Sequence, residues 1–216
     1  MKVKICCISS IEEARLAVQA GAGALGLVGP MPSGPGVISL EEIANIVQTI
    51  PGDQDTFLLT SKTTVEDVLE EHGLAKTSTI QIVDDTPNEI LSILKTELPE
   101  VNLVQVVHVI DDASLSYALE KASFADMLLL DSGNPGLQVK ELGGTGRTHN
   151  WSISRKIVEQ SPVPVFLAGG LRAENVRQAI DRVHPYGLDL CSGVRTKGQL
   201  DPKKLETFFE AVEKST

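Results

Sequence analysis

Two side chains in this sequence stand where a base and an acid could act on one substrate. Cys6 ends the apolar run 3–6, and Asp131 ends the apolar run 127–131. A thiolate at a strand end acts as a general base where nearby positive charge favours it, and a carboxyl group whose site raises its pKa can donate a proton. The simpler alternatives are an inert buried cysteine and a solvated aspartate that caps the next loop.

This pair suits one class of reaction, an aldose–ketose isomerisation. One group removes a carbon-bound proton, and the other protonates the departing ring oxygen. Neither step requires a metal or a redox cofactor, and the sequence has no CxxC spacing of the kind that holds metals. We therefore expect a catalytic pair that works with no metal and no cofactor.

Glycine-rich turns follow the last three apolar runs of the chain. The candidate phosphate-binding residues in these turns are Gly143, Gly144, Gly169, Gly170, Ser192 and Gly193. Bare backbone N–H groups can approach phosphate oxygens closely, and a nearby helix N-terminus adds a favourable dipole. Glycines that only permit tight turns are the alternative, but glycine turns after two successive late runs favour a phosphate site.

These residues need a fold that brings them together, and the chain alternates short apolar runs with amphipathic stretches. The expected strands are 3–6, 24–28, 56–60, 79–83, 103–109, 127–131, 163–168 and 188–191. The expected helices are 10–19, 39–49, 65–72, 88–98, 113–122, 151–160, 173–183 and 202–214. Ser10 and Ser39 stand where N-caps belong, and Glu42 completes a capping box with Ser39.

Eight strand–helix units in 216 residues predict a (β/α)8 TIM barrel, formed as a single domain over residues 1–216. An open doubly wound sheet also alternates strands and helices, but its glycine-rich turn belongs after the first strand. Active sites of barrels lie at the C-terminal ends of the strands. That rule selects Cys6, Asp131 and the late glycine turns as neighbours.

Composition excludes several kinds of partner. The formal net charge is −10, which disfavours nucleic acid and anionic membrane surfaces as partners, and we interpret this charge as a contribution to solubility. No apolar stretch is long enough to span a membrane. The cysteines are Cys6, Cys7 and Cys191, an odd number without a disulfide framework, so we expect a reducing, cytoplasmic location.

Four motifs together resemble the phosphoribosylanthranilate isomerase family of tryptophan biosynthesis, over nearly the full chain. They are Lys4-Ile5-Cys6, the run GGTGRTHNW at 143–151, the run LAGGL at 167–171 with Glu174-Asn175-Val176 behind it, and the run PYGLDLCSGV at 185–194. The resemblance implies an Amadori rearrangement of a phosphorylated sugar-amine by a Cys general base and an Asp general acid. These fall on Cys6 and Asp131.

The resemblance also implies roles for other positions. The phosphate loops of the family fall on Gly169, Gly170, Ser192 and Gly193. Asp189 matches an aspartate that helps to orient the substrate. Members of the family are monomers or homodimers, and this sequence has no exposed apolar stripe that decides between the two.

Several positions depart from the pattern of the family. Cys7 replaces the usual glycine, so either Cys6 or Cys7 can be the reactive thiol. Gly36 stands where an arginine holds the anthranilate carboxylate, and loss of such a pair costs about 1.5–3 kcal/mol. Gln81 is kept, but Val83 replaces a histidine. The residues that could restore the missing charge are Arg147, Arg172 and Arg195.

Three functions remain open at this point. The first is isomerisation of phosphoribosylanthranilate, and the second is the same chemistry on a different N-phosphoribosyl amine. The third is a non-catalytic barrel that binds a sugar phosphate. Binding alone would not need both Cys6 and Asp131, which favours an enzyme, whereas Gly36 and Val83 favour the second function over the first. The first is placed slightly ahead, because the later motifs are so fully present.

Overall fold

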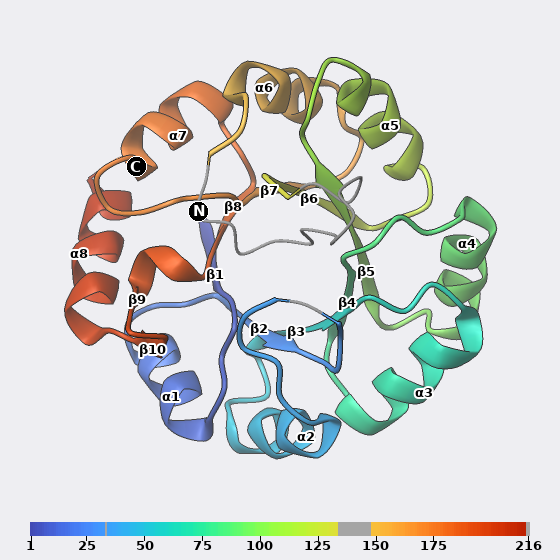
Figure 1. Cartoon of the computed structure of the whole chain (residues 1–216), viewed down its shortest axis with the longest axis horizontal. Coiled ribbons are helices and arrows are strands. Elements are labelled where there is room, and N and C mark those ends of the chain that lie inside the picture. The colour runs from blue at the N-terminus through green and yellow to red at the C-terminus, as the bar shows by residue number, and fades with distance from the viewer. Residues whose placement is uncertain (33, 134–147, 215–216) are drawn as a thin grey trace.

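The computed structural model describes residues 1–32, 34–133 and 148–214. Within these residues, eight parallel strands close into a barrel in chain order, β1 to β8, with β8 hydrogen-bonded to β1. The helices form a ring around the barrel (Figure 1). The expectation of a (β/α)8 barrel is confirmed.

The elements follow the order predicted from the apolar runs. The strands are β1 (Lys2–Ile5), β2 (Ala24–Val28), β3 (Asp55–Thr60), β4 (Thr79–Ile82), β5 (Asn102–His108), β6 (Met127–Asp131), β7 (Val165–Leu167) and β8 (Gly187–Leu190). The helices are α1 (Ile11–Gln19), α2 (Leu40–Thr49), α3 (Val65–Ala75), α4 (Asn88–Glu97), α5 (Ala113–Lys121), α6 (Trp151–Gln160), α7 (Val176–Val183) and α8 (Pro202–Glu213).

Polar side chains fix where several helices begin. The hydroxyl groups of Ser10 and Ser39 accept hydrogen bonds from the backbone N–H groups of Glu13 and Glu42, at 3.2 and 3.1 Å. Each bond satisfies a donor that the first turn of a helix leaves free. The predicted N-caps of α1 and α2 are therefore confirmed.

Helix α7 begins later than predicted, and Asn175 explains why. Its side chain accepts a hydrogen bond from the N–H of Arg172 and donates one to the carbonyl of Gly170, both at 2.9 Å. These bonds hold 170–175 as a turn, since a short amide side chain competes with helical hydrogen bonding. The expected start at 173 is therefore wrong.

A short segment after β8 was not predicted as regular structure. It contains the 3-10 turn η1 (Ser192–Val194) and a small antiparallel hairpin of β9 (Arg195–Thr196) and β10 (Gln199–Leu200). Glu13 of α1 ties this segment to the start of the chain, because it pairs with Arg195 and accepts from the N–H of Leu200 at 2.8 Å.

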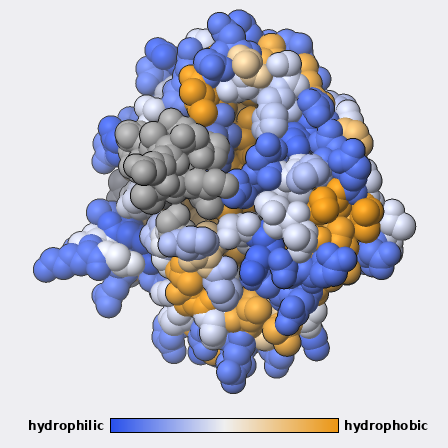
Figure 2. Space-filling model, turned by 45° about the vertical axis from the view of Figure 1, so that its right-hand side comes forward, coloured by the Kyte–Doolittle hydropathy of each residue, from blue (hydrophilic) through white to orange (hydrophobic). Residues whose placement is uncertain are grey.

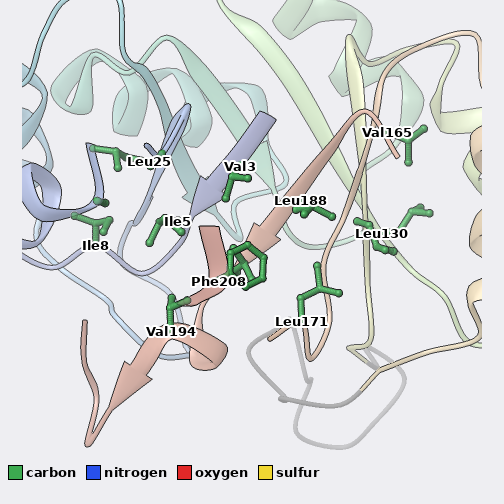
Figure 3. Packing of buried hydrophobic residues seen from close by; sticks show 14 of the residues in the cluster. Val3, Ile5, Ile8, Leu25, Leu130, Val165, Leu171, Leu188, Val194 and Phe208 are labelled. Atoms are coloured by element: carbon green, nitrogen blue, oxygen red, sulfur yellow. The ribbon is translucent and has the colours of Figure 1, made fainter. Parts of the chain in front are cut away.

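Alternation along the strands divides the buried side chains into two layers. In β1, Val3 and Ile5 face the helices, where they join a large cluster that includes Phe208 of α8 (Figure 3). Lys4 is fully buried and lies against Phe57, a member of the cluster inside the barrel. Cys6 belongs to that inner cluster, so the strand directs it into the barrel mouth.

The face of the molecule seen in Figure 2 is mostly hydrophilic, with apolar side chains in smaller areas. Within the described residues, none of the helices combines the length and the apolar character that crossing a membrane requires.

Candidate active site

A pocket opens at the C-terminal ends of the strands, where barrel enzymes bind their substrates. It brings together the expected base, the expected acid and the two late glycine turns. Its lining includes Cys6, Cys7, Gln81, Asp131, Gly169, Gly170, Asp189, Cys191 and Ser192. Most of the remaining lining side chains are apolar.

Cys6 sits beside a buried positive charge. Cys6 and Lys4 both flank Gly26 of β2, where a Cβ atom would lie 2.9 Å from the Cys6 Sγ and 3.1 Å from the Lys4 Cε. Burial by itself lowers the pKa of Lys4. Asp189 and the nearby Cys6 together have a larger effect in the opposite direction, so the pKa of Lys4 is raised. Lys4 therefore stays protonated and places a positive charge beside the Cys6 side chain.

Asp189 holds Lys4 in place from the next strand of the ring. The Lys4 Nζ donates to the Asp189 Oδ1 at 2.9 Å, and the two residues are direct register partners across β1 and β8. Both are buried, so each depends on the other for compensation of its charge.

Asp131 ends β6 inside the same pocket. Burial raises the pKa of its carboxyl group. The hydrogen bond that the N–H of Ser132 donates at 2.7 Å and the nearby His108 both lower this pKa, but burial has the larger effect. The neighbouring charge of Asp189 raises it further. A carboxyl group with a raised pKa keeps its proton to a higher pH than an ordinary aspartate, which suits it as a proton donor.

The two late glycine turns pack against each other at one side of the pocket. Gly169 and Gly170 both have positive φ angles, 83° and 60°, which favour glycine. A Cβ atom on Gly193 would lie 2.0 Å from the carbonyl oxygen of Leu171, so this position has no room for a side chain. Ser192 opens η1 and lines the pocket beside Gly170.

Three predicted residues, Gly143, Gly144 and Arg147, lie outside the described residues. Arg172 and Arg195, the other two arginines that could replace the missing arginine at position 36, lie outside the pocket lining. The Arg195 guanidinium bonds to Glu13 at 2.7 Å and to the carbonyl groups of Cys6 and Cys7. Arg172 faces Glu174 at 3.4 Å, and it lines other cavities than this pocket. Neither arginine is among the residues that line this pocket.

Cys7 adopts an unusual conformation, with a φ of 62°. Its thiol hydrogen-bonds with Cys191 and Cys6, and these bonds together with burial raise its pKa well above the ordinary value. The same bond with Cys7, helped by the charge of Arg195, lowers the pKa of Cys191. Cys7 therefore ionises less readily than an ordinary cysteine, which disfavours it as the general base.

This arrangement predicts which cysteine reacts first with an alkylating reagent. Cys191 is half-buried and has a lowered pKa, whereas Cys6 and Cys7 are each 5% exposed. We expect iodoacetamide to label Cys191 before the other two, as peptide mapping by mass spectrometry would measure. Equal labelling of Cys7 and Cys191 would contradict the hydrogen-bond arrangement.

Residues 3–211 match the family model of N-(5'phosphoribosyl)anthranilate (PRA) isomerase. The chain belongs to this family. Among curated PRA isomerases, it is 34% identical over 211 residues to that of Methanothrix thermoacetophila, which covers 98% of this chain and 97% of the relative. It is also 34% identical to that of Nostoc punctiforme, over 97% of each protein.

Solved PRA isomerase structures share the fold. The enzyme from Pyrococcus furiosus superposes with a TM-score of 0.82 at 29% identity, over 99% of both chains. A PRA isomerase in complex with reduced 1-(o-carboxyphenylamino)-1-deoxyribulose 5-phosphate superposes with a TM-score of 0.83 at 25% identity, over 99% of both chains. Mutually generated monomers of the dimeric enzyme from Thermotoga maritima superpose with a TM-score of 0.81 at 25% identity, again over 99% of both chains.

Sequence reasoning missed three residues of this site in the PRA isomerase fold. Lys4 appeared in a quoted motif without a role, although its position two residues before Cys6 places both on one strand face. Gly26 leaves the room that the Cys6 thiol occupies. His149 lies beside the glycine turn, since a Cβ on Gly169 would meet its Nδ1 at 3.1 Å.

The burial of His149 predicts a loss of stability in acid. Burial lowers the pKa of His149 from 6.5 to about 4, so the unfolded chain binds this proton first. Stability should therefore fall as the pH drops from about 6.5 to about 4, by roughly 3 kcal/mol. Urea unfolding at several pH values measures this, and His149→Gln should flatten the dependence. The exposed His184→Asn serves as control.

Proposed function

We propose that this chain isomerises N-(5'-phosphoribosyl)anthranilate to 1-(o-carboxyphenylamino)-1-deoxyribulose 5-phosphate, with Cys6 as general base and Asp131 as general acid. Membership of the PRA isomerase family supports the reaction. One observation supports the residues: Cys6 beside the charged Lys4, and Asp131 with a raised pKa, line the same pocket as the two glycine turns.

The proposed steps begin at the ring oxygen. Asp131 donates a proton to this oxygen, the bond from C1 to the oxygen breaks, and the nitrogen lone pair forms a C1–N double bond. Cys6 then removes the proton from C2, and the electrons form a C1–C2 double bond that neutralises the iminium. The C2 hydroxyl finally loses its proton to Asp131 while C1 regains one from Cys6, which gives the ketose.

Binding of the phosphate is proposed for the two glycine turns. Gly169 and Gly170 donate no backbone hydrogen bond within the described residues, and Ser192 begins the turn η1 beside them. Free N–H groups and the start of a helical turn suit an anion. Asp189 keeps Lys4 charged and in position, and through Lys4 it supports the base.

The test supplies phosphoribosylanthranilate to the purified protein and follows the loss of its fluorescence. The proposal predicts a rate well above that of the uncatalysed reaction, with competition by inorganic phosphate. A rate equal to that of Cys6→Ala and Asp131→Ala variants would overturn it. We expect a single barrel domain that works as a monomer or a homodimer, in a reducing cytoplasm.

A second candidate is the same chemistry on a different N-phosphoribosyl amine. The observation that favours it is the packing of Gly36 on Cys7, which leaves no room for a side chain at position 36. A third candidate, a non-catalytic barrel that binds a sugar phosphate, would leave the pairing of Cys6 and Asp131 without a use.

A further inference from the structure

The three cysteines of the chain meet at one side of the pocket, and all of them are free thiols. Cys6 and Cys7 follow β1, Cys191 follows β8, and each of them lines the pocket. The two strands are neighbours in the ring: Ile5 pairs with Leu190, and the N–H of Cys6 donates to the carbonyl of Leu190 at 2.7 Å. Closure of the barrel therefore brings together thiols that are far apart in the sequence.

The thiol of Cys7 lies against that of Cys191. Cys7 has a φ of 62°, and its S–H group hydrogen-bonds with the Cys191 sulfur. Neighbouring strands are about 4.8 Å apart, which lies within the Cα separations of about 4.4–6.8 Å that a disulfide spans. Cys7 and Cys191 can therefore be joined with little movement of the backbone.

Cys6 is turned toward the other neighbour of its strand. β1 lies between β8 and β2, and a Cβ atom on Gly26 of β2 would lie 2.9 Å from the Cys6 Sγ. This sulfur is therefore on the side of β1 that faces away from Cys191. A bond between Cys6 and Cys7 is disfavoured as well, because consecutive Cα atoms are only about 3.8 Å apart, below the disulfide range. Cys7 and Cys191 are the pair that the geometry favours.

Arg195 lies beside this pair, in the hairpin after β8. Its guanidinium donates to the carbonyl of Cys7 at 2.5 Å and to that of Cys6 at 3.3 Å. The hydrogen bond with Cys7 and the charge of Arg195 lower the pKa of Cys191, and burial and the nearby Asp189 oppose this effect without cancelling it. Cys191 is also half-buried, whereas Cys6 and Cys7 are each 5% exposed. An accessible thiol that ionises readily beside a second thiol is the usual arrangement of a redox-sensing cysteine.

We propose that Cys191 is a site of oxidation by hydroperoxides, that Cys7 converts the oxidised form into a disulfide, and that this bond reversibly inactivates the pocket. Cys7 follows Cys6, the proposed base, and Cys191 precedes Ser192, which opens the turn η1. The disulfide therefore joins residues adjacent to the base and to the proposed phosphate site. The inactivation rests on the proposed function, whereas formation of the disulfide does not.

The oxidation takes place in two steps. The Cys191 thiolate attacks one oxygen of hydrogen peroxide, the O–O bond breaks, and the second oxygen takes up a proton and leaves as water. The sulfur of Cys7 then attacks the sulfur of the resulting sulfenic acid. The S–S bond forms, the S–O bond breaks, and the hydroxyl group leaves with the Cys7 proton as a second water. The two thiols lose two electrons in all, and the peroxide gains them.

The test treats the reduced protein with hydrogen peroxide and maps its peptides without reduction. We expect the peptide that contains Cys7 to be joined to the peptide that contains Cys191. We also expect kcat/KM to fall by about tenfold or more, since displacement of a catalytic group by about 1 Å can cost about a hundredfold. Dithiothreitol should reverse both changes. A protein that forms no such link overturns the inference, and so does a linked protein that keeps its full activity.

Two variants assign the bond, because trypsin leaves Cys6 and Cys7 in one peptide. Cys7→Ala should form no link to Cys191. Cys6→Ala is the matched control, since it removes one thiol from the same pocket, and it should form the link as the wild type does. A link between Cys6 and Cys191 in the Cys7→Ala variant overturns the pairing.

The wild-type protein decides the inference even if a variant fails to fold. Fragmentation of its linked peptide between Cys6 and Cys7 then shows which sulfur is bonded to Cys191. If the untreated protein has no isomerase activity, the proposed function and the inactivation are both overturned. The peptide map still decides whether the disulfide forms.

Discussion

Cys6→Ala is expected to lower kcat for the isomerisation by about a hundredfold to ten-thousandfold, the usual contribution of a general base. The variant keeps the strand and the buried Lys4–Asp189 pair, so substrate binding should change little. Stopped-flow or steady-state kinetics on the purified variant measures the effect. KM should stay within a few-fold of the wild-type value, because the lost interaction belongs to the transition state.

Cys7→Ala is the comparison that identifies the base. Its thiol has a raised pKa because it hydrogen-bonds with Cys191 and Cys6 and is buried. We therefore expect this variant to keep kcat within about tenfold of the wild type, a smaller loss than the hundredfold or more expected for loss of a base. A severe loss in Cys7→Ala with an active Cys6→Ala would transfer the role to Cys7.

Asp131→Asn is expected to lower kcat by a similar factor while making the protein more stable. An amide cannot protonate the departing ring oxygen, so the loss should be about a hundredfold to ten-thousandfold. Because burial raises the pKa of Asp131, the folded carboxylate is disfavoured near neutral pH. Removal of this charge should raise the free energy of unfolding by about 0.5–2 kcal/mol, as often occurs at active sites.

The stability gain should depend on pH in one direction. Between the ordinary aspartate pKa of 3.8 and its raised value, the folded state holds more protons than the unfolded chain. Stability of the wild type therefore falls as the pH rises through this window, and the advantage of the variant appears over the same range. Urea unfolding at pH 7 and below pH 3.8 measures both limits. An equal gain at both pH values would refute the raised pKa of Asp131.

The strand ends could be located from the sequence because strands in a covered parallel sheet are continuous apolar runs. Cys6 and Asp131 each follow such a run, and the rule that barrel sites lie at strand ends then places them in one pocket. The serine caps of α1 and α2 were predictable for a similar reason, since their hydrogen bonds are local.

The surroundings of Cys6 were harder to predict because they depend on closure of the ring. Lys4 and Asp189 are far apart in the sequence, and they meet only because β8 pairs with β1 in one register. Period-two alternation alone would have placed Lys4 inside the barrel with Cys6. It could not have supplied the partner that keeps this lysine charged.

The contact of Gly36 with Cys7 could not be predicted at all. It arises from two positive φ angles and from the path of the loop after β2. The resemblance to the family implies only that Gly36 stands in place of an arginine and Cys7 in place of a glycine. The structure relates the two changes, because the side chain of Cys7 occupies the space beside Gly36.

The most direct test of the central claim is to identify the product formed from an N-(5-phosphoribosyl) aryl amine. Wild-type protein and a Cys6→Ala, Asp131→Asn double variant are each incubated with the substrate, and the sugar is analysed by NMR. Wild type should yield the 1-amino-1-deoxyribulose phosphate, and the double variant should not exceed the uncatalysed rate. If the wild type binds the substrate in competition with phosphate but forms no ketose, the claim is contradicted.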